Sequence, residues 1–178
     1  MIVVGLCGLA QSGKDTAAGA LIEDGFIRLA FADALRDAVY ALDPIVGSDG
    51  VGARSVVDAL GWDLAKTSFP EVRRVLQRFG TEVGRDQFGE GFWVERLRAQ
   101  MSGSALGYVI TDCRFVNEER FVHSLGGVMV RVVRPGVSLL NDHSSEAHIS
   151  GLVVDAEIVN DGSVAGLHGA IRSLVWGI

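Results

Sequence analysis

The feature that most constrains this chain is a glycine-rich loop directly behind an apolar run at the N-terminus. The run Ile2–Cys7 predicts a buried strand, and Gly8–Thr16 reads GLAQSGKDT. A strand, a glycine loop and a helix in this order form a phosphate-binding loop, in which backbone N–H groups and the start of the helix surround a polyphosphate. Lys14 supplies the mobile cation for the outer phosphates. The pattern therefore predicts nucleotide binding at the end of the first strand.

One position of this loop departs from the usual pattern. The residue after the lysine is normally Ser or Thr, whose hydroxyl holds Mg²⁺. Here it is Asp15, and Thr16 stands one position later. The loop by itself predicts phosphate binding. The reaction has to be inferred from this loop, with its unusual Asp15, together with other motifs of the chain.

The composition is that of one soluble globular domain covering residues 1–178, with 48% hydrophobic and 21% charged residues. The net charge of −6 argues against a broad nucleic-acid-binding surface. No apolar run approaches the roughly 20 residues that span a membrane, and the N-terminal apolar run does not have the form of a signal peptide. We therefore expect a cytoplasmic protein whose two cysteines, Cys7 and Cys113, are buried reduced thiols.

Strands and helices alternate along the chain. Further strands are predicted at 26–31, 108–111, 128–133 and 156–159, and helices at 14–24, 32–42, 53–60, 70–84, 91–101, 115–124 and 164–176. This alternation predicts an α/β fold with a parallel sheet of about five strands, covered on both faces, and with ligands at the carboxyl ends of the strands. Residues 43–52 are predicted to be a loop, and residues 134–151 an irregular segment long enough to form a lid.

Polar residues follow the predicted strands where ligands would bind. They are Asp33, Asp112, Arg114, Asn117, Glu118, Arg134 and Asn160–Gly162. Asp112 after an apolar strand resembles the acidic residue that helps to hold Mg²⁺ behind a phosphate loop. Simpler roles remain open, because Asp33 and Asp161 are suited to capping helices and Arg114 and Glu118 to forming an ion pair on one helix face.

Two other segments are dense in polar residues. Leu76–Asp86 places arginines on both sides of Gly-Thr-Glu, and these arginines are suited to binding an anionic substrate. Asp142–His148 contains two histidines and two carboxylates. A metal site is not favoured there, because metal ligands usually have a regular spacing on an ordered structural element, and these residues are expected on a polar loop.

Taken in order, these motifs resemble the bacteriophage deoxynucleoside monophosphate kinases of the P-loop kinase superfamily, over nearly the whole chain. The matching segments are 13–16, 31–35, 77–85, 93–94, 111–118, 126–127, 131–135 and 143–146. Gly-Lys-Asp-Thr, with its displaced Thr16, is itself the form found in that family. The resemblance implies a three-layer P-loop kinase fold with a helical monophosphate-binding insertion at about 32–100 and a lid at about 134–151.

The resemblance also implies a reaction. ATP would donate its γ-phosphoryl group to the 5′-phosphate of a deoxynucleoside monophosphate (dNMP), giving the diphosphate (dNDP), with Mg²⁺ as cofactor. ATP and dNMPs would be the partners, with no nucleic acid polymer and no membrane, in the host cytoplasm for a phage-encoded protein. The oligomeric state stays open, a homodimer included, and so do the accepted bases.

The resemblance assigns roles residue by residue. Catalysis would fall to Lys14, Asp15, Asp112 and Arg134, with Arg131 the less favoured alternative to Arg134 as the arginine that closes on the phosphates. ATP would contact Gly8, Gln11, Ser12, Gly13, Lys14, Thr16, Asn160, Asp161 and Gly162, the last three bordering the adenine. The dNMP would contact Phe31, Asp33, Arg78, Thr81, Glu82, Arg85, Trp93, Asp112, Arg114, Asn117 and Glu118. Asp15, Thr16 and Asp112 would hold Mg²⁺, directly or through water, and a place beside the acceptor phosphate is the alternative for Asp15.

Two other functions fit parts of the pattern. A dephospho-coenzyme A kinase shares the predicted sheet and would use Asp33 as a general base toward a sugar hydroxyl. A nucleotide-dependent ATPase or switch needs the phosphate loop, but the sequence contains no Asn-Lys-x-Asp guanine-reading motif. The acceptor of the phosphoryl group distinguishes these functions.

Overall fold

The computed structural model describes residues 1–103, 105–137 and 148–177, and the chain divides into two compact units. The first unit comprises Met1–Ala30 and Ala99–Ile178, and the second comprises Phe31–Arg98. The second unit occupies nearly the same residues as the insertion expected at about 32–100. No helix in the described ranges is both long and apolar enough to cross a membrane.

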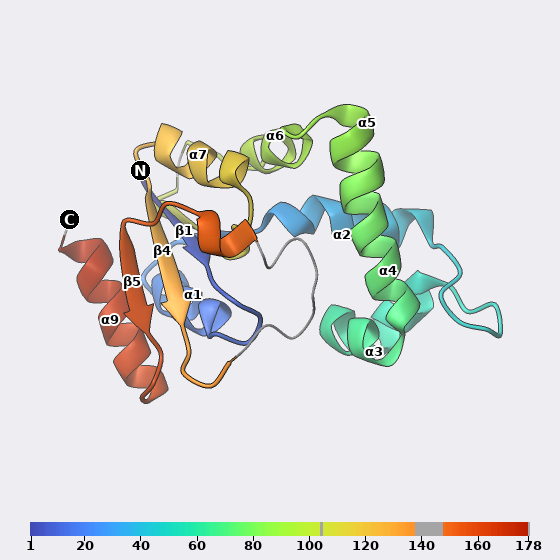
Figure 1. The fold of residues 1–178 in the computed structure, drawn as a ribbon, viewed down its shortest axis with the longest axis horizontal. Helices are drawn as coiled ribbons and strands as arrows, with labels where there is room; N and C mark the ends of the chain where they lie inside the picture. The colour runs from blue at the N-terminus through green and yellow to red at the C-terminus, as the bar shows by residue number, and fades with distance from the viewer. Residues whose placement is uncertain (104, 138–147, 178) are drawn as a thin grey trace. The chain divides into compact units, whose positions relative to one another are not determined.

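The first unit is built on a parallel five-stranded sheet with the order β2-β3-β1-β4-β5 (Figure 1). The strands are β1 (Ile2–Cys7), β2 (Ile27–Leu29), β3 (Gly107–Ile110), β4 (Val128–Val133) and β5 (Ala156–Val159). The predicted α/β fold and its five strands are confirmed. Because β1 lies between β3 and β4, the loop that follows it leaves from the centre of the sheet, where ligands of such folds bind.

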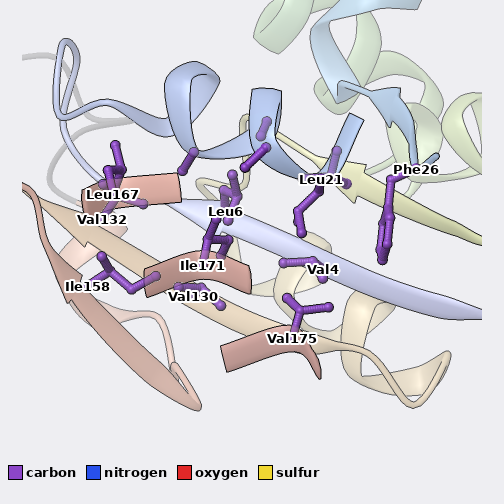
Figure 2. Close-up of a cluster of buried hydrophobic side chains, with 14 residues drawn as sticks. Val4, Leu6, Leu21, Phe26, Val130, Val132, Ile158, Leu167, Ile171 and Val175 are labelled. Carbon is purple, nitrogen blue, oxygen red and sulfur yellow. The ribbon is translucent and has the colours of Figure 1, made fainter. Parts of the chain in front are cut away.

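One face of the sheet is covered by α1 (Lys14–Glu23) and α9 (Val164–Trp176). Apolar side chains of both helices pack against Val4, Leu6 and Val130 and exclude water from this face (Figure 2). Burying each such aliphatic side chain stabilises the fold by about 1.5–3 kcal/mol. The phosphate loop therefore stands between a rigid central strand and a firmly packed helix.

The opposite face of the sheet packs against α7 (Val116–Ser124). Only glycine fits at position 5 of the central strand, because Met129 and Val122 fill the space that a side chain would need. A Cβ atom there would overlap the Met129 sulfur. Cys7 and Cys113 are both buried free thiols, as predicted. Burial raises the pKa of each above its ordinary value, which keeps the thiols neutral.

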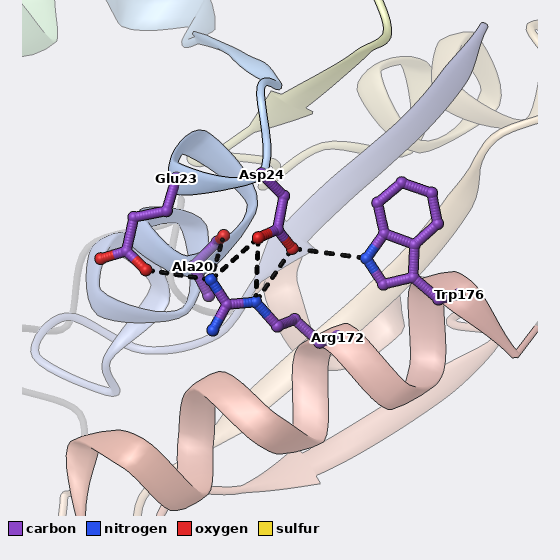
Figure 3. A network of polar contacts seen from close by, with 5 residues as sticks. All are labelled: Ala20, Glu23, Asp24, Arg172 and Trp176. Atoms are coloured by element: carbon purple, nitrogen blue, oxygen red, sulfur yellow. Dashed lines mark hydrogen bonds and ion pairs between the residues drawn. The ribbon is translucent and has the colours of Figure 1, made fainter.

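Arg172 joins the two helices on the first face (Figure 3). Its Nε donates hydrogen bonds to both carboxylate oxygens of Asp24, at 3.1 and 2.9 Å, and its Nη2 donates to the carbonyl of Ala20 at 3.0 Å and to Glu23 at 2.9 Å. Trp176 Nε1 also donates to Asp24, at 3.3 Å. A cation at this position complements the negative end of the α1 dipole.

The second unit is helical. It contains α2 (Phe31–Leu42), α3 (Ala53–Ser68), α4 (Pro70–Arg78), a π-helix η1 (Phe79–Arg85), α5 (Asp86–Phe88) and α6 (Phe92–Arg98). Its own core contains Val39, Val56, Val72 and Leu76. Pro70 begins α4, where its missing N–H costs no hydrogen bond.

Several elements in and next to the helical unit differ from the sequence predictions; among them, α6 ends at Arg98 rather than at 101, and the short α5 was not predicted. The second strand ends at Leu29 rather than at 31, so Phe31 and Asp33 lie in the first turn of α2. The predicted helix at 53–60 continues to Ser68 through a kink at Gly61, whose φ of 69° favours glycine. The predicted helix at 70–84 changes to a π-helix at Phe79, and this class of helix is often found at functional sites.

Candidate functional site

The loop after β1 has the backbone conformation of an anion-binding site. Gly8 and Gly13 have φ angles of 141° and 104°, and Gln11 also has a positive φ of 64°. Gly13 is the N-cap of α1, so the first N–H groups of that helix, which have no acceptors within it, open into the loop. The arrangement concentrates backbone donors and the positive end of the α1 dipole at one point.

Lys14 lies across this loop. Its Nζ donates hydrogen bonds to the carbonyl oxygens of Gly8 at 3.0 Å and Leu9 at 2.8 Å. Burial lowers the pKa of Lys14, the nearby guanidinium of Arg114 lowers it further, and the carboxylates of Asp15 and Asp112 oppose this effect. Asp15, Asp112 and Arg114 therefore all influence the charge of Lys14 within the first unit.

The segment after β3 carries Asp112 and Arg114 to the same edge of the sheet. The Cys113 N–H donates to the carbonyl of Leu6 at 3.1 Å, which ties this segment to β1. Glu118, which is 2% exposed, accepts hydrogen bonds from the backbone N–H groups of Arg114 at 2.8 Å and Phe115 at 3.1 Å. Glu118 therefore fixes the turn that presents Arg114, and Asn117 lies beside it in the first turn of α7.

A cavity of about 380 Å³ opens beside the loop within the first unit. It is lined by Gly8, Leu9, Ser12, Arg131, Val132, Val133, Arg134, Val137, Ile149 and Ser150. The buried Ser12 Oγ and Arg131 Nε have no hydrogen-bond partner among the described residues. Buried polar atoms are rarely left unsatisfied, so these two are suited to a polar ligand group or to water.

The two arginines of this cavity differ in their contacts. Arg131 Nη2 donates to the carbonyl oxygens of Ile149 at 3.2 Å and Leu152 at 3.1 Å, so it holds the segment that returns toward β5. Arg134 is exposed at the end of β4. Much of the predicted lid, including His143–Glu146, lies outside the described residues.

Asn160, predicted to border the adenine, contacts the loop directly. Its Nδ2 donates to the carbonyl oxygen of Ser12 at 2.9 Å. Asp161 and Gly162 follow it at the exposed surface. The sequence pattern placed Asn160 after the last strand but contained no signal for this contact.

The second unit holds most of the predicted acceptor residues. Arg78 in α4 pairs with Glu82 in η1 through hydrogen bonds of 2.7–3.0 Å, and this pairing lowers the pKa of Glu82. Thr81 is exposed in η1, and Arg85 Nη1 donates to the carbonyl of Glu90 at 3.5 Å. These residues cluster along one short stretch of helix.

The other acceptor residues of the second unit are less exposed. Phe31 is buried in the first turn of α2, and Asp33 lies 3.4 Å from Arg36. Trp93 is 5% exposed, and its Nε1 donates to the carbonyl of Gly80 at 2.8 Å. Trp93 also lines a cavity of about 180 Å³ with Phe88 and Phe92. Its indole N–H thus supports η1.

Comparison with known proteins bears on the reaction. A protein of Acanthamoeba polyphaga mimivirus, named provisionally as a deoxynucleotide monophosphate kinase, is 29% identical over 193 residues, which cover 98% of this chain and 96% of the relative. The deoxynucleotide monophosphate kinase of Escherichia phage RB69 is 32% identical over 108 residues, covering 58% of this chain and 44% of the phage protein. The match therefore spans less than half of the phage enzyme.

A solved dephospho-CoA kinase from Campylobacter jejuni has 15% identity and a TM-score of 0.48, with 98% of each chain covered. Residues 56–171, more than half of the chain, match the family described as deoxynucleotide monophosphate kinase, which is a family of phosphotransferases. With its phosphate loop at the centre of a parallel sheet, this chain belongs to the deoxynucleotide monophosphate kinase family.

Proposed function

We propose that this protein transfers the γ-phosphoryl group of ATP to the 5′-phosphate of a deoxynucleoside monophosphate, with Mg²⁺ as cofactor. The observation that carries the proposal is Lys14, whose Nζ lies on the backbone of a loop with positive φ angles at Gly8 and Gly13, and whose charge is influenced by Asp15, Asp112 and Arg114. A phosphate oxygen of the acceptor bonds to the γ-phosphorus while the bond to the bridging oxygen of ADP breaks. Such a transfer needs alignment and charge neutralisation more than covalent help.

The ATP side is assigned to the phosphate loop. Gly8, Gln11, Ser12, Gly13 and Thr16 would surround the phosphates, with Asn160–Gly162 close to the loop. Lys14 would exchange its bonds to the carbonyls of Gly8 and Leu9 for bonds to the outer phosphates. Its partial burial strengthens those bonds, because a lower local dielectric increases electrostatic attraction. We assign the closing arginine to Arg134, since Arg131 is already bonded to Ile149 and Leu152.

The residues that would hold Mg²⁺ fit that ion chemically. Asp15, Thr16 and Asp112 offer carboxylate and hydroxyl oxygens, the hard ligands that Mg²⁺ prefers. Both carboxylates act on the charge of Lys14, which supports their closeness to the phosphates. When bound, the ion would neutralise charge on the phosphate oxygens. Asp15 would thus replace the Ser or Thr that usually follows the lysine.

The acceptor side is assigned to the residues that the family resemblance indicates. Arg78, Arg85 and Arg114 would bind the monophosphate, because arginine pairs with phosphate through two parallel hydrogen bonds. The base and sugar would contact Phe31, Asp33, Trp93, Asn117 and Glu118. Thr81, Glu82 and Asp112 are also assigned to the dNMP site. For Arg78, this requires its bond to Glu82 to exchange for a bond to the substrate.

An acceptor panel tests the proposal. The purified protein is incubated with ATP, Mg²⁺ and one acceptor at a time: each deoxy- and ribonucleoside monophosphate, and dephospho-coenzyme A. We expect ADP and a dNDP from at least one dNMP, with the reaction abolished by a metal chelator. Phosphorylation of dephospho-coenzyme A alone, or ATP hydrolysis that no monophosphate affects, would contradict it.

A further inference from the structure

We propose that Asn160 is a positioning residue that holds the Ser12–Gly13 peptide in the orientation needed to bind a nucleotide phosphate. This inference rests on the proposed function, because it places the phosphates of ATP in the loop Gly8–Thr16. It gives Asn160 a different role from that of a residue lining the adenine site. The role depends on one hydrogen bond between segments 148 residues apart in sequence, from Asn160 Nδ2 to the Ser12 carbonyl oxygen at 2.9 Å.

The Asn160 amide is itself held in place by the sheet. Asn160 follows β5 directly, and its backbone N–H donates to the carbonyl of Val133 in the neighbouring strand at 2.7 Å. The side chain therefore projects from a backbone that is tied to the end of the sheet. Because the backbone of Asn160 is held by the sheet, its side-chain Nδ2 can hold the Ser12 carbonyl in one orientation through their hydrogen bond.

Peptide planarity transmits this constraint to the phosphate. In a trans peptide the C=O and N–H groups point in opposite directions. A Ser12 carbonyl that is bonded to Asn160 therefore turns the Gly13 N–H away from Asn160. If the peptide rotated by half a turn, it would present a carbonyl oxygen in place of that donor, and this would repel an anion.

Glycine at position 13 makes an external constraint necessary. Gly13 has φ 104° and ψ 16°, a left-handed conformation that glycine adopts without strain. Glycine also has the widest choice of other conformations, so the peptide before it turns easily. Asn160 removes that freedom in the folded chain.

The packing of the two residues agrees with this role. A Cβ atom on Gly13 would overlap Asn160 Nδ2, so the amide occupies the space that the missing side chain leaves. Ser12 is 1% exposed and is among the residues that line the cavity beside the loop, and its buried hydroxyl has no hydrogen-bond partner among the described residues. The Ser12 carbonyl is thus bonded to Asn160, while the Ser12 hydroxyl makes no competing bond among the described residues.

Two variants of Asn160 test the hydrogen bond. Asn160→Asp has nearly the same shape but cannot donate while ionised, and Asn160→Leu cannot donate at any pH. The dissociation constant of ADP with Mg²⁺ is measured by calorimetry between pH 4 and 8, a range that reaches the ordinary aspartate pKa of about 3.9, and circular dichroism establishes that each variant is folded at each pH. Val159→Thr is the matched control, because Val159 is the preceding residue and is 52% exposed.

We expect both variants to bind ADP about tenfold more weakly than the wild type at pH 7.5, and Val159→Thr to bind it normally. As the pH falls, the protonated carboxyl of Asn160→Asp regains a donor, so its affinity relative to wild type should recover, whereas that of Asn160→Leu should not. The inference is overturned if Asn160→Leu binds ADP within about twofold of wild type, or if the two variants keep the same affinity ratio at every pH. A wild type that binds ADP but phosphorylates no dNMP contradicts the proposed function alone.

Discussion

The ring of Trp93 fills the space that a side chain on Gly84 would need. A Cβ atom on Gly84 would overlap three atoms of the indole, and the indole N–H donates to the carbonyl of Gly80 in the same π-helix. Trp93 therefore packs against η1 and also bonds to it. This contact shapes the stretch of helix between Arg78 and Arg85.

Gly84→Ala should destabilise the protein because the added methyl group overpacks the contact with Trp93. We expect the free energy of unfolding to fall by about 1–3 kcal/mol, measured by urea denaturation followed by circular dichroism. Gly91→Ala is the control, since a Cβ atom at Gly91 meets nothing within 4 Å. Equal denaturation midpoints for the two variants would show that the contact is looser than the structure indicates.

Lys14→Ala should remove the cation that the loop presents to the outer phosphates. We expect kcat for dNMP phosphorylation to fall by about 100- to 1000-fold, the range seen when one preorganised charge or donor is lost. The fold should persist, as judged by circular dichroism. Lys66→Ala is the matched control, because Lys66 is the other lysine in the sequence and it pairs with Asp63. A Lys14→Ala enzyme with near-normal kcat would refute the assignment.

Asp15→Ala tests the unusual position of the loop, because alanine removes the carboxylate without supplying the hydroxyl that serine would offer to Mg²⁺. If Asp15 helps to hold Mg²⁺, removing its charge should raise the Mg²⁺ concentration for half-maximal rate by about fivefold or more. The measurement is a Mg²⁺ titration of the initial rate at fixed ATP and dNMP concentrations. The exposed Asp37 provides a comparison through Asp37→Asn, which should leave the titration unchanged. Full activity of Asp15→Ala with an unaltered titration would mean that Asp15 has no special role.

Arg172→Met should weaken the attachment of α9 to α1 in a pH-dependent manner. The hydrogen bond from Arg172 is the main cause that lowers the pKa of Asp24 below its ordinary value of 3.8. Ionised Asp24 therefore contributes to the free energy of unfolding. This contribution is fully present above the pKa that Asp24 has in the unfolded chain, and it is lost as the pH falls through the lower pKa of the folded protein.

The difference in Tm between wild type and Arg172→Met should therefore be constant from pH 5 to 8 and shrink below about pH 4. Thermal melts across this range measure it, with Arg120→Met as an exposed-arginine control. A difference in Tm that stays the same down to pH 3 would assign the effect of Arg172 to packing rather than to its charge.

The strands and the phosphate loop were predictable because their signals are local. A continuous apolar run such as Val128–Val133 is typical of a strand buried on both faces, and the structure has a strand at those residues. Gly8 and Gly13 identified the loop because glycine is favoured where φ is positive, as observed at both positions. The grouping of Asp112 and Arg114 near Lys14 followed from the parallel sheet, whose strand ends share one edge.

The helical unit was less predictable because distant contacts decide its details. Phe31 belongs to an apolar run by sequence, yet it begins α2, and a short run does not distinguish the two outcomes. The π-helix at 79–85 depends on a tryptophan whose bond to Gly80 spans 13 residues. Helical periodicity carries no information about such a partner.

The sequence by itself determined the order of the elements, the parallel sheet and the place of the phosphate loop, since apolar runs and glycines act on their immediate neighbours. Tertiary structure alone decided the partners of the polar side chains. The sequence places Asn160 directly after the last strand. Its bond to Ser12 exists because folding brings the ends of strands that are distant in sequence to one edge of the sheet. Hydrogen-bond partners depend on position in space, which the spacing of residues along the chain does not specify.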